Sequence, residues 1–171
     1  MTYQPNSKNT PEKVLSLSMA ILAVVLFSSS GFVEKFSGMY QITAFVFAIV
    51  SIQIYLKYVF SNYIYKATED SLQVYKVTGK KCICVASLDY EMSISQIINS
   101  EKYLESKHTY PKTNFNVNYC KNLFPKNYSV YFFEFNGKKS MMKFEPDSEF
   151  ANYVNALISQ AVNEADDIFE D

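Results

Sequence analysis

The sequence predicts an α+β protein in which a two-helix transmembrane hairpin precedes an antiparallel β-sandwich or partly open barrel, closed by a C-terminal helix. Three observations lead to this fold class. Uncharged apolar residues are concentrated in the first third of the 171-residue chain. Runs of β-branched and aromatic residues, separated by turn residues, fill most of the remainder, as in sheet proteins. Near the C-terminus, apolar residues recur at the three- and four-residue spacing of one helix face.

Two long uncharged runs predict the hairpin. Residues 14–33 contain no charged side chain, and residues 36–56 contain none either. A hydrocarbon core about 30 Å thick is crossed by about 20 helical residues, so each run is long enough to span it. Because only Glu34 and Lys35 carry charge between the runs, the two helices are expected to be antiparallel neighbours. A cleaved signal peptide is the alternative for the first run, but the apolar part of such a peptide is usually only about 7–15 residues long.

The basic residues that flank the runs predict the side of the membrane on which each end lies. Lys8 and Lys13 precede the first run, Lys57 and Lys66 lie at or just after the end of the second, and Lys35 is alone in the connection. Cytoplasmic flanks carry the excess of Lys and Arg, so we expect a cell-membrane protein with both termini in the cytoplasm. The three Cys agree with this placement, because free thiols persist in the reducing cytosol.

Polar side chains inside the runs raise the question of helix association. They are Ser16, Ser18, Ser28, Ser29, Ser30, Gln41, Thr43, Ser51 and Gln53. Such side chains either contact the partner helix or another subunit, or are tolerated near the helix ends, and the second interpretation is favoured for most of them. Gln53 lies deeper, which gives the hypothesis that it mediates association through hydrogen bonds of on the order of 1 kcal/mol. The expected partners are the lipid bilayer and a protein or second copy bound through the hairpin.

The region after Asn62 predicts about seven strands. The predicted strands are residues 63–67, 72–77, 81–88, 114–123, 128–136 and 138–144, with residues 92–103 as either a short helical turn or a strand. Gly79 and the Asn136–Gly137 pair predict tight hairpin turns, because these residues accept positive φ. The strand at 81–88 is apolar on both faces, and the polar residues 101–113 are expected to form a loop.

A C-terminal helix is predicted after Pro146. Asp147 or Ser148 can cap its first turn, and Glu149 complements the helix dipole there. One apolar face consists of Phe150, Tyr153, Val154, Leu157, Ile158 and Ala161. This face is expected to plug the open end of the sheet core. Residues 164–171 carry five acids and are expected to be a frayed tail.

Composition excludes several functional classes. With 16 basic and 17 acidic residues, the net charge of −1 excludes a nucleic-acid binder that works by bulk electrostatics. Every basic residue is Lys, so the bidentate recognition of phosphate or carboxylate by Arg is absent. One His and four Gly leave little material for multi-His metal sites or Gly-rich phosphate loops.

The cysteines and the single histidine form the one candidate chemical cluster. Cys82, Cys84, Cys120 and His108 have the donor types of a Cys3His zinc site, but their spacing matches no known zinc pattern. A catalytic Cys-His pair would draw on the same residues and has no local signature. We therefore expect the cysteines to act as small apolar core residues, and we assign no catalytic, cofactor-binding or metal-binding residue.

Two segments suggest a family. TEDSLQVYKVTGKK follows the second run, and FFEFNGKKSMMKFEPDSEFANYVNAL lies near the end of the chain. With the hairpin, this architecture resembles small bacterial membrane proteins that carry a cytoplasmic pleckstrin-homology-like domain. The resemblance implies two near-orthogonal antiparallel sheets closed by a C-terminal helix. It indicates where the protein is located more than what its mechanism is. The predicted division is residues 1–13 as an N-terminal tail, 14–60 as the hairpin (14–33 and 36–60), 61–163 as the pleckstrin-homology-like domain and 164–171 as an acidic tail.

The resemblance invites a phosphoinositide function, which the charges argue against. From Asn62 onward there are 12 Lys against 15 acidic residues, so no specific phosphoinositide binding is expected. We expect a membrane-anchored, non-catalytic interaction or scaffold module without a cofactor. The alternatives are an accessory subunit of a larger membrane transporter complex and a Cys-based metal or redox sensor.

Overall fold

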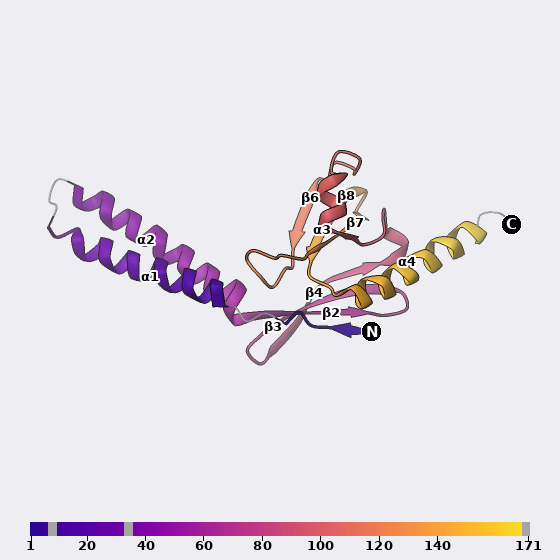
Figure 1. Ribbon diagram of the computed structural model, residues 1–171, viewed down its shortest axis with the longest axis horizontal. Helices are drawn as coiled ribbons and strands as arrows, with labels where there is room; N and C mark the ends of the chain where they lie inside the picture. The colour runs from indigo at the N-terminus through magenta and orange to yellow at the C-terminus, as the bar shows by residue number, and fades with distance from the viewer. Residues whose placement is uncertain (7–9, 33–35, 169–171) are drawn as a thin grey trace. The chain divides into compact units, whose positions relative to one another are not determined.

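The computed structural model describes residues 1–6, 10–32 and 36–168, with side chains as far as Asn163. The chain divides into two compact units. One comprises Met1–Asn6 together with Asn62–Asp171 and is a mixed α+β domain, which we call the β domain. The other comprises Ser7–Ser61 and is a helical hairpin (Figure 1). The predicted α+β class is therefore confirmed.

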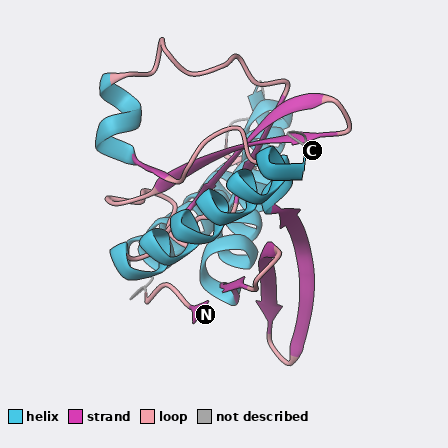
Figure 2. Ribbon diagram, turned by 90° about the vertical axis from the view of Figure 1, so that its right-hand side faces the viewer, coloured by secondary structure: helices cyan, strands magenta, loops and turns pink. Residues whose placement is uncertain are grey.

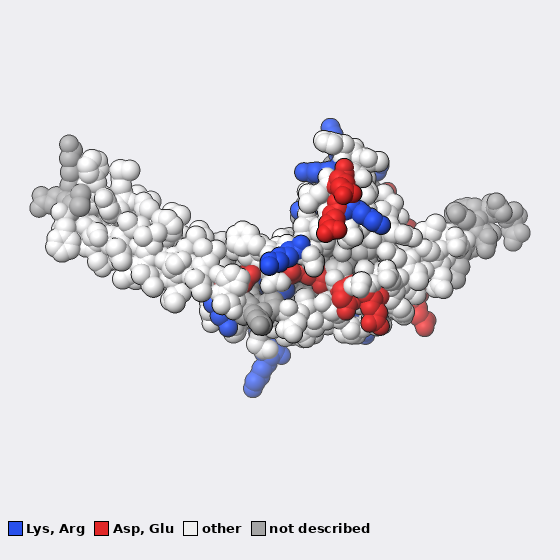
Figure 3. All heavy atoms as spheres, in the orientation of Figure 1, with Lys and Arg blue, Asp and Glu red and all other residues white. Residues whose placement is uncertain are grey.

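Two apolar helices form the hairpin. Helix α1 spans Thr10–Ser29, and helix α2 spans Ser37–Ile54 and continues directly into the π-helical segment η2 at Tyr55–Phe60. Both are long and apolar enough to cross a membrane, and only 17% of each apolar stretch is buried. The core helix of a water-soluble domain would be mostly covered, so this exposure favours lipid as the surrounding medium. Figure 3 shows a surface along the hairpin that is almost free of charged side chains.

Helix α1 begins earlier than the uncharged run predicted. It starts at Thr10 rather than Val14, because Pro11 fits the first turn of a helix and Glu12 complements the dipole there. Glu12 was expected in the tail, yet its side chain is only 2% exposed. The described residues do not include Lys8, Val33, Glu34 and Lys35, which were used to predict the ends of the runs and the side of the membrane.

Ser16 of α1 and Ser51 of α2 connect the two helices. The Ser16 hydroxyl donates to the Ser51 carbonyl at 3.0 Å, and the Ser51 hydroxyl donates to the Ser16 carbonyl at 2.7 Å. Both side chains are buried. Ala23 and Ala44 are buried as well, and their small side chains allow the helices to approach closely. The interpretation of these polar residues as merely tolerated was therefore wrong for Ser16 and Ser51. Gln53 is exposed, so its predicted role in association stays a prediction.

Sheet A of the β domain has the strand order β1-β2-β3-β4. Its strands are β1 (Thr2–Tyr3), β2 (Ser61–Ala67), β3 (Ser71–Thr78) and β4 (Lys81–Asp89). The last three confirm the predicted strands. The turn of the β3–β4 hairpin, at the bottom of the view in Figures 1 and 2, projects beyond the rest of the domain, and Gly79 in it has a φ of 60°. Strand β1 was not predicted, because two residues carry no periodic signal.

Sheet B has the order β5-β7-β8-β6 and contains one parallel pair, β6 with β8. Its strands are β5 (Ile98–Asn99), β6 (Phe115–Asn118), β7 (Ser129–Phe135) and β8 (Lys138–Phe144). The β7–β8 hairpin was predicted, with Asn136–Gly137 at its turn. The segment 92–103, predicted as either a helical turn or a strand, contains strand β5 and the start of helix α3 (Ser100–Glu105). Residues 101–105 of the predicted loop are therefore helical. The short helix η3 (Tyr90–Met92) precedes them.

Helix α4 (Ser148–Ile168) closes the core between the sheets. Asp147 caps it, because its carboxylate accepts the amide of Phe150 at 2.7 Å. Phe150, Val154 and Ile158 are at most 3% exposed and pack with core residues of both sheets, as the apolar stripe predicted. The prediction was wrong for Tyr153, which is 39% exposed because it lies at the edge of the apolar face. The helix continues to Ile168, so the predicted frayed tail is helical at residues 164–168, and residues 169–171 lie outside the described chain.

Candidate functional site

The candidate cluster of Cys82, Cys84, Cys120 and His108, against which the sequence analysis argued, does not form among the described residues. Cys82 and Cys84 lie at alternate positions on β4 and are exposed, whereas Cys120 is buried at 1% exposure. His108 is exposed in the turn after α3. In the described chain, no group of three or more His, Cys, Asp or Glu is placed to hold a metal ion. The core interpretation was right for Cys120 and wrong for the other two, because the first half of β4 extends past the core.

A buried carboxylate holds the segment after β6 in place, and no sequence pattern predicted it. Glu145 is 7% exposed and accepts hydrogen bonds from the Lys121 amide at 2.6 Å and the Asn122 amide at 2.9 Å, and from the Asn122 side chain at 2.7 Å. Its own amide donates to the Tyr65 hydroxyl, which in turn donates to the Tyr119 carbonyl. Burial raises the pKa of the Tyr65 hydroxyl, so this group stays a donor at neutral pH. The arrangement is a structural anchor.

The inner face of sheet B, which covers the core, continues past the end of that core. Phe115 on β6, Ser140 on β8 and Phe133 on β7 lie opposite one another in one row. Phe133 is 5% exposed and belongs to the core, whereas Phe115 in the same row is 60% exposed. One step farther out, Phe135 lies opposite Lys138 and is 53% exposed. Two aromatic rings that are each more than half exposed thus lie on a face that elsewhere forms the core.

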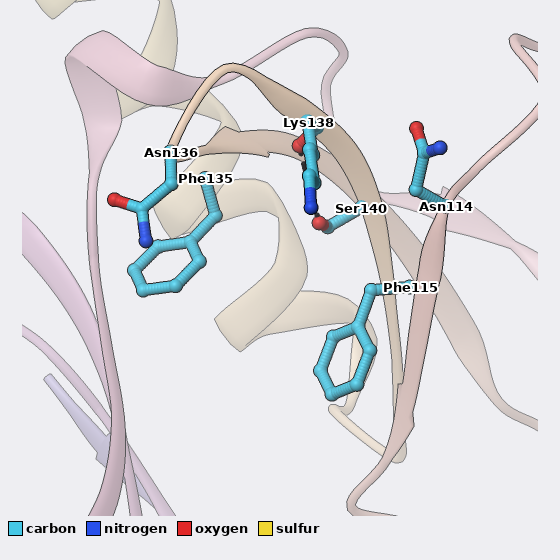
Figure 4. A pocket seen from close by; sticks show the side chains of 6 residues that line it. All are labelled: Asn114, Phe115, Phe135, Asn136, Lys138 and Ser140. Atoms are coloured by element: carbon cyan, nitrogen blue, oxygen red, sulfur yellow. Dashed lines mark hydrogen bonds between the residues drawn. The ribbon is translucent and has the colours of Figure 1, made fainter.

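A hollow of about 480 Å³ lies between these rings. It is lined by Asn114, Phe115, Phe135, Asn136, Lys138 and Ser140 (Figure 4). Ser140 is 2% exposed and forms the floor, since a small side chain between larger neighbours leaves a depression. The lining is mostly apolar with a few polar groups, which is the usual character of a binding site. We call these six residues the end hollow and take it as the candidate functional site.

The end hollow combines residues that are far apart in the sequence. Asn114 and Phe115 reach it because β6 pairs in parallel with β8 and the Asn114 amide donates to the Lys139 carbonyl at 2.8 Å. Phe135 and Asn136 arrive through the β7–β8 turn, where Asn136 and Gly137 both have positive φ. Sequence patterns predicted the strands but not the site, because an alternating strand shows which residues share a face and not where the cover over that face ends.

Comparison with known proteins adds no family, since no family model, no curated protein and no solved structure matches the chain.

Proposed function

We propose that this chain is a membrane-anchored, non-catalytic interaction module whose β domain binds a protein partner at the cytoplasmic membrane surface. The observation that carries the proposal is the end hollow, where Phe115 and Phe135 are each more than half exposed on a face that elsewhere forms the core. Exposed aromatic residues beside a depression are characteristic of protein interfaces, in which a few such side chains supply most of the binding energy.

Membrane attachment is supported by the hairpin. Its two helices have the length and apolar character of spans. Strand β2 begins at Ser61, directly after η2 ends at Phe60, so no linker separates the β domain from the second helix. A domain attached in this way stays within reach of partners in or on the membrane.

The pairing of β1 with β2 supports the proposed topology. Thr2 and Tyr3 precede the first helix, and they lie opposite Lys66 and Tyr65, which follow the second. Segments of one sheet must lie on one side of a bilayer, which agrees with two spans between them and with an uncleaved first helix. The lysine excess on these flanks supports the cytoplasmic side.

The proposed pleckstrin-homology-like character has architectural support. Two four-stranded sheets pack around a core that a C-terminal helix closes. Strand β6 lies within the predicted strand 114–123, but its parallel pairing with β8 differs from the antiparallel sheets that were expected. The N-terminal strand β1 is an addition to the predicted pattern.

Placement is tested with the exposed cysteines of the full-length protein in intact cells. A membrane-impermeant maleimide should label Cys82 and Cys84 only after permeabilisation, and the protein should stay in the membrane pellet after alkaline extraction. Labelling of these two residues from outside would contradict the cytoplasmic placement, and release into the supernatant would contradict the membrane anchor.

The binding role is tested by purification from native membranes with a matched pair of variants. Phe135→Ser changes the end hollow, and Phe124→Ser removes a phenylalanine that is 74% exposed and lies outside it. Proteins that co-purify with the wild type should remain with Phe124→Ser and be lost with Phe135→Ser. Equal recovery with both variants would show that the end hollow is not the binding site.

A further inference from the structure

The free edge of β6 is the least protected strand edge in the described chain. The edge strands are β1 and β4 in sheet A and β5 and β6 in sheet B. Proteins protect edges from pairing by very short strands, lysines, prolines and bulges. β1 and β5 have two residues each, and β4 starts with Lys81 and contains a register shift opposite Val74 and Tyr75. Strand β6 reads Phe-Asn-Val-Asn and pairs with β8 without any shift.

The exposure of β6 agrees with an open edge. Phe115, Asn116 and Asn118 are exposed, and only Val117 is half-buried against the core. At the far end of this strand, the Tyr119 hydroxyl donates to the Val85 carbonyl of β4 at 3.3 Å. Phe115 belongs both to this edge and to the end hollow, so a chain that pairs with β6 also meets the hollow.

Among the residues that the structure describes, no acidic side chain lines the end hollow beside its positive charge. Lys138 is its charged member, and in Figure 4 its side chain extends over the hollow between Phe135 and Phe115. The adjacent Lys139 lies on the opposite face of β8, where it is opposite Glu134 of β7. Because neighbouring strand residues point to opposite faces, Glu134 is directed away from Lys138. A ligand for the hollow is therefore expected to bring a negative charge.

We propose that an extended segment of a partner protein adds to sheet B as a strand beside β6. In this segment an apolar and an acidic residue are two positions apart, so that both side chains lie on the face of the end hollow. Main-chain hydrogen bonds to the β6 edge supply affinity, and side chains on one face of the added strand supply specificity. An apolar side chain covers the ring of Phe115 and enters the end hollow, and a carboxylate of the segment pairs with Lys138. This inference rests on the proposed function, for which it names the partner's chemistry.

Charge distinguishes this occupant from a second copy of the chain. Strand β6 contains no acidic residue, so a second copy paired through it would bring no carboxylate to Lys138, whereas an acidic segment neutralises this lysine. An anionic lipid would satisfy Lys138 but would leave the main-chain groups of the β6 edge without partners. Both are outcomes that the experiment distinguishes.

The test uses the full-length protein in phosphatidylcholine nanodiscs and a fluorescein-labelled octapeptide, Val-Ser-Glu-Ser-Val-Ser-Glu-Ser, which carries Val and Glu on one face. Binding is read by fluorescence anisotropy. Two matched peptides test the charge and the main-chain pairing separately. One has Lys in place of Glu, and the other has central residues replaced by Pro, which cannot donate main-chain hydrogen bonds. We expect saturable binding of the parent peptide and binding weaker by about tenfold or more for each of the others. Hydrogen exchange should show slower exchange of the β6 amides when the peptide is bound.

Matched protein variants test the individual side chains. Lys138→Gln should weaken binding of the acidic peptide by about fivefold, and Lys139→Gln, on the opposite face, should leave it unchanged. Phe115→Ser should reduce binding strongly, and Phe124→Ser should not. Because all four side chains are exposed, each variant is expected to keep the wild-type unfolding midpoint, which is measured alongside.

Several outcomes would overturn the inference. The Pro peptide could bind as well as its parent, the two lysine variants could weaken binding equally, or β6 exchange could stay unchanged at saturation. Concentration-dependent dimerisation that protects β6 without peptide would identify a second copy as the occupant. Competition by phosphatidylglycerol added to the nanodiscs would identify a lipid. If the peptides fail but partner recovery still depends on Phe135, this inference falls and the proposed function stands; if recovery is independent of Phe135, the proposed function itself fails.

Discussion

Tyr3 and Tyr65 lie opposite each other on the paired strands β1 and β2, with their rings stacked at a centroid distance of 6.3 Å. The ring of Tyr3 also lies 6.0 Å from that of Phe150, the first core residue of α4. The segment before the first helix therefore contributes to the core of the β domain, although the whole hairpin lies between Tyr3 and Tyr65 in the sequence. This relationship links the stability of the β domain to residues that a sequence reading assigns to a tail.

Tyr3→Ala should destabilise the β domain by about 1–3 kcal/mol, because it removes aromatic contacts with Tyr65 and Phe150 and exposes part of the core. The measurement is urea unfolding of the full-length protein in a non-ionic detergent, followed by tyrosine fluorescence. Thr2→Ala is the control, since Thr2 is exposed and should change the unfolding free energy by less than about 0.5 kcal/mol. Equal stability of both variants and the wild type would mean that β1 contributes nothing.

Ser51→Ala should weaken the hairpin by about 0.5–1 kcal/mol, because it removes the hydroxyl that donates to the Ser16 carbonyl. Ser51→Leu should have a larger effect, since the position is only 6% exposed and cannot hold a longer side chain without separating the helices. The measurement is the SDS mole fraction of half-unfolding in mixed micelles. Ser18→Ala is the control, because the Ser18 hydroxyl bonds to Leu15 of its own helix. A wild-type value for Ser51→Leu would exclude close packing of the helices at this position.

Glu145→Gln should destabilise the β domain by about 2–4 kcal/mol, because a buried carboxylate that accepts three hydrogen bonds is replaced by an amide with one acceptor oxygen. Hydrogen exchange at the amides of Lys121 and Asn122 should become faster, and urea unfolding gives the free energy. Glu134→Gln, at an exposed position of β7, is the matched control and should change the stability by less than about 0.5 kcal/mol. Unchanged exchange at Lys121 and Asn122 would contradict the anchoring role.

The elements that sequence reasoning predicted share a strong local signal. The uncharged runs became α1 and α2, the Asn136–Gly137 turn became the β7–β8 hairpin, and the apolar stripe from Phe150 became the buried face of α4. In each case, hydrophobic periodicity or turn chemistry within a few residues determines the local structure. Tertiary context changed the details, such as the start of α1 at Thr10.

The residues that sequence reasoning missed depend on contacts between distant segments. Tyr3 becomes a core residue only through pairing with β2, and Glu145 becomes an anchor only because the Cys120–Asn122 segment folds over it. The exposure of Cys82 and Cys84 has the same origin, because their strand has an apolar composition but extends past the core. The end hollow depends on where that core stops, which no local pattern records.

Stability should fall above pH 10, because the unfolded chain ionises its tyrosines more easily than the folded chain does. Burial raises the pKa of Tyr131 from 10.0 to about 12, although its hydrogen bond with Ser93 lowers it, and burial also raises the pKa of Tyr65 and Tyr90. A raised folded-state pKa gives stability that is fully present below pH 10 and is lost as the pH rises through the folded value. Tyr131 alone accounts for about 2 kcal/mol of this loss between pH 10 and pH 12.

The measurement for this prediction is urea unfolding at a series of alkaline pH values, with tyrosinate absorbance recorded in parallel. Tyr131→Phe should show a shallower loss of stability above pH 10, because it removes one group with a raised pKa, and Tyr40→Phe in the hairpin serves as the control outside the β domain. Tyrosinate absorbance at pH 11 equal to that of the unfolded chain, from a β domain that is still folded, would show that these hydroxyls are not protected by burial, and the predicted pH dependence would then be wrong.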